Sequence, residues 1–179
     1  MLIYETFVQF EVVITNYLMK TKSEIITVGL DNKEVTSWEG FKTVPHMTID
    51  EVNPAEVDLF VLPGGEPDRL FNSEKLDKLL SELYNKEKVL AAICAAPVHL
   101  ARAGILEKHN FTTTLPLNEF KSFNKDKYLD KNVVVDGNII TAKAAGYVDF
   151  ALAIGKKMNI FKDKSDYEET VQYFKEYNQ

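Results

Sequence analysis

Two uninterrupted apolar runs, each followed by a helical pattern, constrain the fold of this chain most strongly. Residues 58–62 (DLFVL) and 88–93 (KVLAAI) have the length and composition of strands that are covered on both faces. A helix that Ser73 can cap follows the first run, and helix-prone sequence at 95–103 follows the second. Strands that alternate with helices favour a parallel sheet with helices on both faces. We therefore expect an α/β sandwich with three layers and a mainly parallel sheet.

Apolar periodicity and turn residues predict the remaining elements. The helix after the opening strand should bury a stripe formed by Phe10, Val13, Ile14, Tyr17 and Leu18. The other expected elements are strands at 2–4 and 24–29, two short strands within 35–44, a hairpin at 133–141, and helices at 147–158 and 165–177. No repeat or linker-like composition divides the chain, so we predict a single domain over residues 1–179.

Charge and hydropathy exclude several classes of partner. The chain has 27 Asp and Glu against 21 Lys and Arg, a net charge of −6, so it lacks the positive field that gathers nucleic acid. Its longest stretch without a charged side chain, residues 89–101, is shorter than the roughly 20 apolar residues of a membrane helix. The N-terminus begins in strand-like sequence without a positively charged leader. We expect a cytoplasmic protein with neither a nucleic acid nor a membrane partner.

Cys94 is the single cysteine, so one chain can form neither a disulfide nor a thiolate metal cluster. It stands where the run at 88–93 meets the following helix, as the nucleophile of a nucleophile elbow does. Ala92 and Ala96 satisfy the need of such an elbow for small residues two positions to either side. A helix N-terminus at this place would lower the pKa of the thiol. The alternative is an inert cysteine that packs as a small apolar residue.

Two further features lie near the ends of predicted strands. Pro63-Gly64-Gly65 follows the run at 58–62, and glycines there would let a backbone N–H approach a ligand. This backbone N–H and the N–H of Ala95 would together form an oxyanion hole. The alternative is that the glycines serve only a tight turn. Glu11 lies in the first helix, near the sheet edge at which doubly wound folds place their sites. A solvated helix carboxylate is the alternative.

Four motifs occur in the order and at the separations of a known superfamily. They are IYETFVQFEV at the start, LPGGEPDRL after the first apolar run, AICAAPVHLARAGIL around Cys94, and VVVDGNIITAKAAGYVDFALAIG. Through them residues 2–158 resemble the ThiJ/PfpI (DJ-type) superfamily. The resemblance implies a flavodoxin-like three-layer sandwich, related to class I glutamine amidotransferase domains and usually assembled as a homodimer. Here a C-terminal helix would complete the fold.

The resemblance also implies roles for the residues singled out above. Cys94 would be the elbow nucleophile, Glu11 the carboxyl group that contacts it, Gly65 and Ala95 the backbone donors, and Gly64 a substrate contact. An ionised Glu11 would oppose a thiolate, whereas a protonated Glu11 would donate a hydrogen bond to sulfur. We therefore predict a raised pKa for Glu11.

Two histidines of related proteins are absent. Peptidase and amidase members have a histidine where Ala95 stands, and other members have one where Leu115 stands, within Thr-Thr-Leu-Pro. A loop similar to Gly-Pro-Gly reads Ala-Ala-Gly at 144–146, which alters a wall of the site. We expect no catalytic or metal-binding role for the three histidines of the chain, His46, His99 and His109.

These residues and the resemblance together imply a cysteine-dependent protein. We expect it to act on small reactive carbonyl compounds, as glyoxalase or deglycase relatives do, without a cofactor or a metal. One alternative is a redox-sensing or stress protein, chaperone-like in action, whose cysteine is oxidised to sulfinate. A further alternative is an intracellular cysteine peptidase or amidase-like hydrolase.

Overall fold

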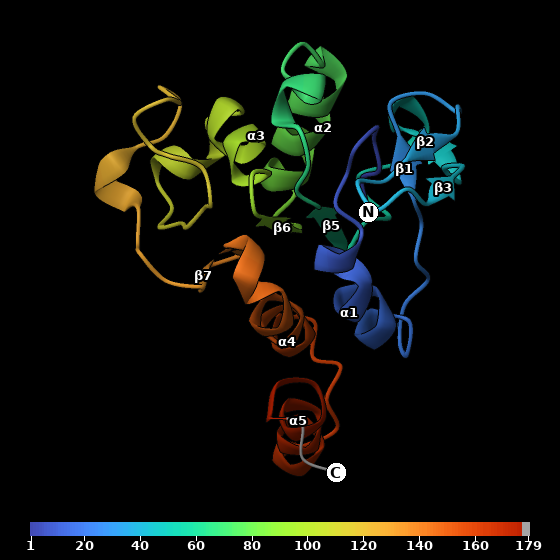
Figure 1. Ribbon diagram of the computed structural model, residues 1–179, viewed down its shortest axis with the longest axis vertical. Coiled ribbons are helices and arrows are strands. Elements are labelled where there is room, and N and C mark those ends of the chain that lie inside the picture. Colours follow the sequence, from blue (N-terminus) through green and yellow to red (C-terminus); the bar gives the residue numbers. More distant parts are fainter. Residues whose placement is uncertain (177–179) are drawn as a thin grey trace.

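A mainly parallel sheet runs through the centre of the molecule, which a computed structural model describes for residues 1–176 (Figure 1). The order of its four central strands is β5-β6-β8-β7. Their bounds are Leu59–Leu62 (β5), Val89–Ile93 (β6), Val133–Asp136 (β7) and Ile139–Ala142 (β8). β5, β6 and β8 are parallel to one another, whereas β7 is antiparallel to β8 through the predicted hairpin. Gly137, with φ +62°, makes the turn of that hairpin.

The N-terminal segment extends the sheet beyond β5. The N–H of Leu2 donates to the carbonyl of Val61 at 2.9 Å, and the N–H of Ile3 donates to the carbonyl of Val28 at 2.8 Å. The opening segment is therefore bonded on both sides, to β5 and to β1 (Val28–Gly29), and β1 pairs in parallel with β4 (Met47–Thr48). The strand predicted at 24–29 was too long, because only β1 pairs. β2 (Val35–Thr36) and β3 (Lys42–Thr43) form the short hairpin expected around Gly40.

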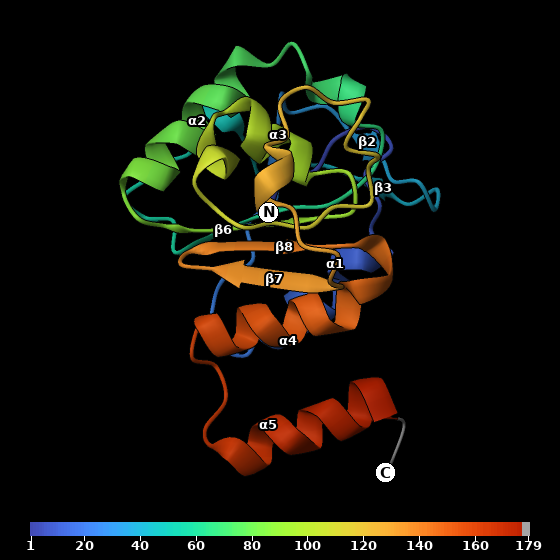
Figure 2. The ribbon, with the colours of Figure 1, turned by 90° about the vertical axis from the view of Figure 1, so that its left-hand side faces the viewer.

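Two helical layers cover the two faces of the sheet (Figure 2). α1 (Phe10–Met19) and α4 (Tyr147–Lys157) pack side by side on one face, and α2 (Glu74–Asn85) and α3 (Pro97–Arg102) cover the other. Alternate residues of β6 enter the two cores, since Leu90 and Ala92 join the core under α2 and α3, whereas Ala91 and Ile93 join the core under α1 and α4. The predicted three-layer α/β sandwich is thus confirmed.

Local sequence explains α2 most completely. Its N-cap Ser73 accepts a hydrogen bond from the N–H of Leu76 at 3.3 Å, as the sequence predicted. The helix buries the four leucines of its apolar face, Leu76, Leu79, Leu80 and Leu83. Short 3₁₀ turns occupy several connections, at Ile49–Glu51, Pro67–Leu70, Ile105–Glu107, Lys125–Lys127 and Ala144–Gly146.

α1 buries a different face from the one predicted. Phe10, Val13 and Tyr17 were expected inside, yet their side chains are 49%, 48% and 65% exposed. The buried face is made of Glu11, Val12, Thr15, Leu18 and Met19. Two adjacent faces of this helix carry apolar residues at helical spacing, so periodicity alone could not choose between them. The observed orientation of α1 therefore places the carboxyl group of Glu11 in the interior.

The C-terminal helix α5 (Lys164–Val171) lies beyond α4 and continues in a π-helical turn at Gln172–Glu176 (Figure 2). Its N-cap is Asp163, whose carboxylate accepts a hydrogen bond from the N–H of Asp166 at 3.0 Å, so the predicted capping box of Ser165 and Glu168 was wrong. The predicted end of this helix, Tyr177, lies outside the described residues.

Within residues 1–176 none of the helices has the length and apolar character needed to cross a bilayer.

His99 on α3 generates a testable prediction about stability. Its side chain is 1% exposed, and neither ring nitrogen has a hydrogen-bond partner among the described residues. Burial, with a smaller effect of Arg102, lowers the pKa of His99 from 6.5 to about 4. The unfolded chain therefore binds the proton first, so stability present above about pH 6.5 is lost as the pH falls toward 4.

We expect the free energy of unfolding to fall by about 3 kcal/mol across this interval because of His99. The substitution His99→Leu should remove that part of the pH dependence. Urea unfolding of both proteins at pH 8, 6 and 4.5 measures it. Equal pH dependence in the two proteins would contradict the prediction.

Candidate active site

Cys94 lies at the carboxyl end of β6, at the sheet edge where the sequence placed it. Its φ of +64° is unusual for a residue with a side chain. Three hydrogen bonds hold this conformation. The Cys94 N–H donates to the carbonyl of Ala142 at 2.9 Å, and the Cys94 carbonyl accepts from the N–H of Thr114 at 3.0 Å and from Oγ1 of Thr113 at 2.9 Å. The backbone is therefore strained and fixed by its surroundings, as in a nucleophile elbow.

The thiol does not have the low pKa that we expected from a helix N-terminus. α3 begins only at Pro97 and has six residues, so Cys94 precedes the helix by a turn. Burial and then the Glu11 carboxylate raise the pKa of the Cys94 thiol to about 12, against the opposing effects of the Ala95 N–H and Thr114. The expected lowering was wrong because the desolvation of the sulfur and the neighbouring carboxylate outweigh the Ala95 N–H and the Thr114 side chain.

Glu11 reaches the sulfur from the first turn of α1. A carboxylate of the β2–β3 hairpin fixes the start of this helix, since Glu39 accepts hydrogen bonds from the N–H groups of Gln9 at 3.1 Å and Phe10 at 2.8 Å. These are two of the donors that a helix leaves unpaired at its N-terminus. Sequence reasoning missed Glu39, because its partners lie in a different element.

The Glu11 carboxylate is held between a backbone donor and the thiol. Oε2 accepts a hydrogen bond from the N–H of Gly64 at 2.9 Å, and the carboxylate also accepts from the Cys94 thiol. Burial raises the pKa of Glu11, while these two hydrogen bonds oppose the rise. The predicted direction for Glu11 is confirmed. The two hydrogen bonds favour the ionised form of Glu11 and so limit the rise in its pKa.

Gly64 has to be glycine because three groups meet at it. A Cβ added there would lie 2.7 Å from Cβ and 3.0 Å from Sγ of Cys94, and it would overlap the Glu11 carboxylate. Neither Gly65 nor Ala95 uses its N–H in a backbone hydrogen bond among the described residues. The Ala95 N–H instead donates to the Cys94 sulfur. The structure thus brings all five residues predicted for the site, Glu11, Gly64, Gly65, Cys94 and Ala95, to one edge of the sheet.

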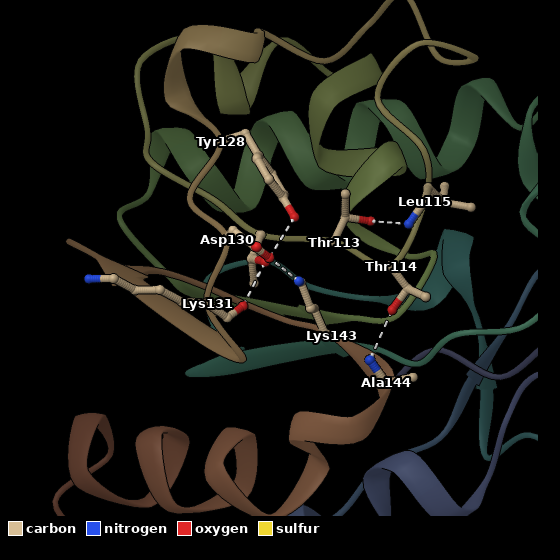
Figure 3. A network of polar contacts seen from close by, with 9 residues as sticks. Thr113, Thr114, Leu115, Tyr128, Asp130, Lys131, Lys143 and Ala144 are labelled. Carbon is tan, nitrogen blue, oxygen red and sulfur yellow. Dashed lines mark hydrogen bonds and ion pairs between the residues drawn. The ribbon is translucent and has the colours of Figure 1, made fainter.

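The loop that follows Phe111 contacts the Cys94 carbonyl through Thr113 and Thr114. Figure 3 shows the polar contacts of this loop with the residues after β8. Thr114 accepts a hydrogen bond at Oγ1 from the N–H of Ala144 at 3.0 Å, which connects this loop to the residues after β8. Lys143 pairs with Asp130, and the Tyr128 hydroxyl donates to the same carboxylate at 3.3 Å. Sequence reasoning identified this loop only by its lack of a histidine. Its observed role is to hold the backbone of Cys94.

The three histidines lie away from Cys94. His99 is in the core, Nδ1 of His46 accepts a hydrogen bond from the N–H of Thr27 at 3.0 Å, and Nε2 of His109 is 3.0 Å from the hydroxyl of Tyr84. Across residues 1–176 no group of three or more His, Cys, Asp or Glu side chains could hold a metal ion.

A cavity of about 610 Å³ lies elsewhere in the molecule. Its lining includes Met19, Met47 and the start of β5, and it does not include Cys94, Glu11 or Gly64. The side chain of Cys94 is itself half-buried. The candidate active site therefore lies at the sheet edge, outside this cavity, and Cys94 is partly accessible there.

Comparison with known proteins identifies the family to which the chain belongs. The sequence pattern of the DJ-1/PfpI family matches residues 1–157. An uncharacterized protein of Methanocaldococcus jannaschii is 39% identical over 128 residues, which cover 69% of this chain and 62% of that protein. The deglycase PfpI of Pyrococcus furiosus is 31% identical over 124 residues, which cover 69% of this chain and 75% of the deglycase. The DJ-1 homolog A of Arabidopsis thaliana is 33% identical over 82% of this chain and 38% of its own length.

Solved structures show the same fold. A DJ-1 superfamily protein of Agrobacterium tumefaciens superposes with a TM-score of 0.88 at 24% identity, over 99% of this chain and 97% of its own. DJ-1beta of Drosophila melanogaster superposes with a TM-score of 0.81 at 25% identity, over 96% of this chain and 93% of its own. With the family pattern matched over most of its length, this chain belongs to the DJ-1/PfpI family.

Proposed function

We propose that Cys94 is a nucleophile that adds to small reactive carbonyl compounds, in the manner of a glyoxalase or deglycase. The observation that carries this proposal is the meeting of a thiol, a buried carboxylate, the N–H of Ala95 at the sulfur and the N–H of Gly65, which has no backbone partner among residues 1–176. Membership of the DJ-1/PfpI family, in which relatives are named deglycase or DJ-1 homolog, supports a role of this general kind. The proposed setting is the cytoplasm, where a free thiol stays reduced.

The ionised Glu11 acts in this proposal as the general base. As the sulfur of Cys94 forms a bond to an aldehyde carbon, the thiol proton passes to Glu11 and the electrons of the carbonyl π bond move onto oxygen. The N–H groups of Gly65 and Ala95 hold this oxyanion. Glu11 then returns the proton to the oxygen, which completes a hemithioacetal. The step needs no cofactor. Peptide or amide hydrolysis is not proposed, because no imidazole lies near Cys94 within residues 1–176.

Turnover of small 2-oxoaldehydes such as glyoxal tests the proposal. We expect the purified protein to consume glyoxal and Cys94→Ser to lose this activity entirely. Glu11→Gln should lower kcat by roughly 10²- to 10⁴-fold, because the proton acceptor is removed. Glu56→Gln is the matched control, since Glu56 is exposed and distant from the site. Absence of turnover in the wild-type protein, or an equal rate in Cys94→Ser, would contradict the proposed activity.

The pH dependence of Cys94 alkylation by iodoacetamide tests the pairing with Glu11. Because the Glu11 carboxylate raises the pKa of the thiol, Glu11→Gln should move the inflection of the rate profile to lower pH. Intact mass measured after timed additions at pH 6 to 10 follows the reaction below the wild-type inflection, so a lower pKa in Glu11→Gln is seen as a faster rate at each pH. If the inflection stays at the same pH in Glu11→Gln, Glu11 does not act on the sulfur.

Oxidation of Cys94 is the second candidate function, and the hydrogen bond between sulfur and Glu11 is the observation that favours it. Two equivalents of hydrogen peroxide would convert the thiol to a sulfinate, each equivalent being reduced to water, and a protonated Glu11 would hold a sulfinate oxygen. A redox sensor should gain two oxygens at low peroxide, lose that gain in Cys94→Ser, and show no turnover of glyoxal. Mass spectrometry of the peroxide-treated protein separates this function from the first.

We propose a homodimer that uses the exposed apolar face of α1 together with the β2–β3 hairpin. The N–H of Trp38 donates to the carbonyl of Phe7 at 2.8 Å, so the two elements adjoin. Together they expose six large apolar side chains, Phe10, Val13, Tyr17, Trp38, Phe41 and Val44. Apolar surface of this extent marks an interface in a protein that is otherwise well charged.

Substitution within this surface tests the dimer. We expect Trp38→Glu to yield a monomer in light scattering coupled to size exclusion, because the charge would have to be buried without a partner. Val135→Glu is the control, since Val135 is also exposed, at 52%, but belongs to β7. A wild-type protein that is monomeric at micromolar concentration would refute the proposal.

A further inference from the structure

The hydroxyl of Tyr4 lies behind the two peptide groups that face Cys94. Tyr4 is only 4% exposed, and its hydroxyl donates to the carbonyl of Gly64 at 2.9 Å. The same hydroxyl is 3.4 Å from the carbonyl of Pro63. No sequence pattern indicated this contact, because Tyr4 reads as a core residue of the opening strand.

Each of these carbonyls belongs to a peptide group whose N–H serves the site. The carbonyl of Pro63 and the N–H of Gly64 form one peptide group, and that N–H donates to Glu11 at 2.9 Å. The carbonyl of Gly64 and the N–H of Gly65 form the next. Because the chain has no cis peptide bond between residues 1 and 176, each N–H points away from its carbonyl. A group that fixes the carbonyls therefore also directs the N–H groups.

Two adjacent glycines make such a restraint necessary. Glycine adopts conformations on both sides of φ = 0 at little cost, so the peptide group between Gly64 and Gly65 can rotate unless it is held. Gly65 has φ +137°, and a Cβ added to it would lie 2.7 Å from the hydroxyl of Tyr4. The N–H of Val8 donates to the carbonyl of Gly64 at 2.9 Å, so this oxygen has two donors.

The tyrosine remains a donor at all pH values at which the protein works. Burial, followed by the charges of Glu11, Cys94 and Glu66, raises the pKa of Tyr4 well above its usual value. Its single hydroxyl proton is therefore always present, and the nearer carbonyl, that of Gly64, takes it.

We propose that Tyr4 is a positioning residue, whose hydroxyl orients the N–H of Gly64 toward Glu11 and the N–H of Gly65 toward the reacting oxygen. The consequence for turnover rests on the proposed function. The consequence for Glu11 does not, because it follows from the hydrogen bonds alone. Without the hydroxyl, the N–H of Gly64 would stabilise the Glu11 carboxylate less well.

Proton NMR of protein labelled with [¹⁵N]glycine tests this directly. The chain has eight glycines, so the amide signals of Gly64 and Gly65 can be resolved and assigned. The Gly64 amide shift should follow the ionisation of Glu11, and this titration should vanish in Glu11→Gln. Cys94 and Glu39 also affect the pKa of Glu11. Each titration is therefore repeated in a Cys94→Ser background, and Glu39 is left unchanged in every variant.

In Tyr4→Phe, which keeps the aromatic ring in the core, the midpoint of the Gly64 titration should rise by about half a pH unit. The Gly65 amide shift should change as well. Tyr84→Phe is the matched control, because it removes a tyrosine hydroxyl that contacts His109 rather than the site. An unchanged Gly64 midpoint in folded Tyr4→Phe would overturn the inference.

A second measurement keeps the wild-type sequence and uses Tyr4→Phe only as a comparison. Replacing tyrosine biosynthetically with 3-fluorotyrosine makes the hydroxyl a stronger donor in an unchanged sequence, and should lower the Gly64 midpoint in the wild-type chain but not in Tyr4→Phe. A midpoint that does not move in the fluorinated wild-type protein would also overturn the inference.

Kinetics separate this inference from the proposed function. Tyr4→Phe should lower kcat for glyoxal roughly tenfold with little change in KM, since the Gly65 donor acts on the transition state. If the wild-type protein shows no turnover while the Gly64 midpoint shifts as expected in Tyr4→Phe, the positioning role is supported and the proposed carbonyl activity is wrong. If turnover is present and Tyr4→Phe changes neither kcat nor the Gly64 midpoint, the positioning role is wrong and the proposed carbonyl activity is unaffected.

Discussion

The buried carboxylate of Glu11 is the group on which the arrangement of the site depends. A carboxyl group in the interior requires hydrogen-bond partners, and Glu11 has two, the N–H of Gly64 and the thiol of Cys94. The hydrogen bond from the Gly64 N–H requires a glycine, because a Cβ at position 64 would overlap the Glu11 carboxylate. The hydrogen bond from the thiol requires Cys94 to adopt its strained φ of +64°. Glu39 caps α1 and so fixes the helix that carries Glu11. Three segments distant in the sequence are therefore specified by one buried carboxyl group.

Sequence alone predicted most of the fold, because its strongest signals are local. The doubly covered strands β5 and β6 were recognised from continuous apolar runs, and α2 from its cap and its leucines. Local sequence cannot decide which face of a helix is buried when two faces carry apolar residues at the same spacing. α1 has apolar residues on two adjacent faces, and only packing against α4 decides that Glu11 turns inward and Tyr17 outward. α3 is shorter than predicted, since helix-prone residues at 95 and 96 are used instead in the turn after Cys94.

The candidate site was predicted in its members but not in its electrostatics. Motif resemblance identified Glu11 and Cys94, yet the pKa of the thiol depends on how far both groups are buried, which no spacing encodes. The residues that hold the site were missed for a related reason. Tyr4 and Thr113 act on backbone carbonyls of segments far away in the sequence, and a tyrosine in a strand or a threonine in a loop has many ordinary roles. Tertiary structure alone gives these side chains their partners.

A protonated thiol is compatible with the proposed nucleophilic role, in which Cys94 and Glu11 share one proton. The two forms of the pair, thiol with carboxylate and thiolate with carboxyl group, differ only in the position of that proton, and each carries a single negative charge. Loss of the second proton would place two negative charges side by side in a desolvated site, which is why the pKa of Cys94 rises to about 12. The transfer that creates the nucleophile therefore leaves the net charge of the pair unchanged. Burial penalises a free thiolate far more than it penalises this internal transfer, so the same desolvation that keeps the resting thiol inert would still permit the proposed addition to a carbonyl carbon.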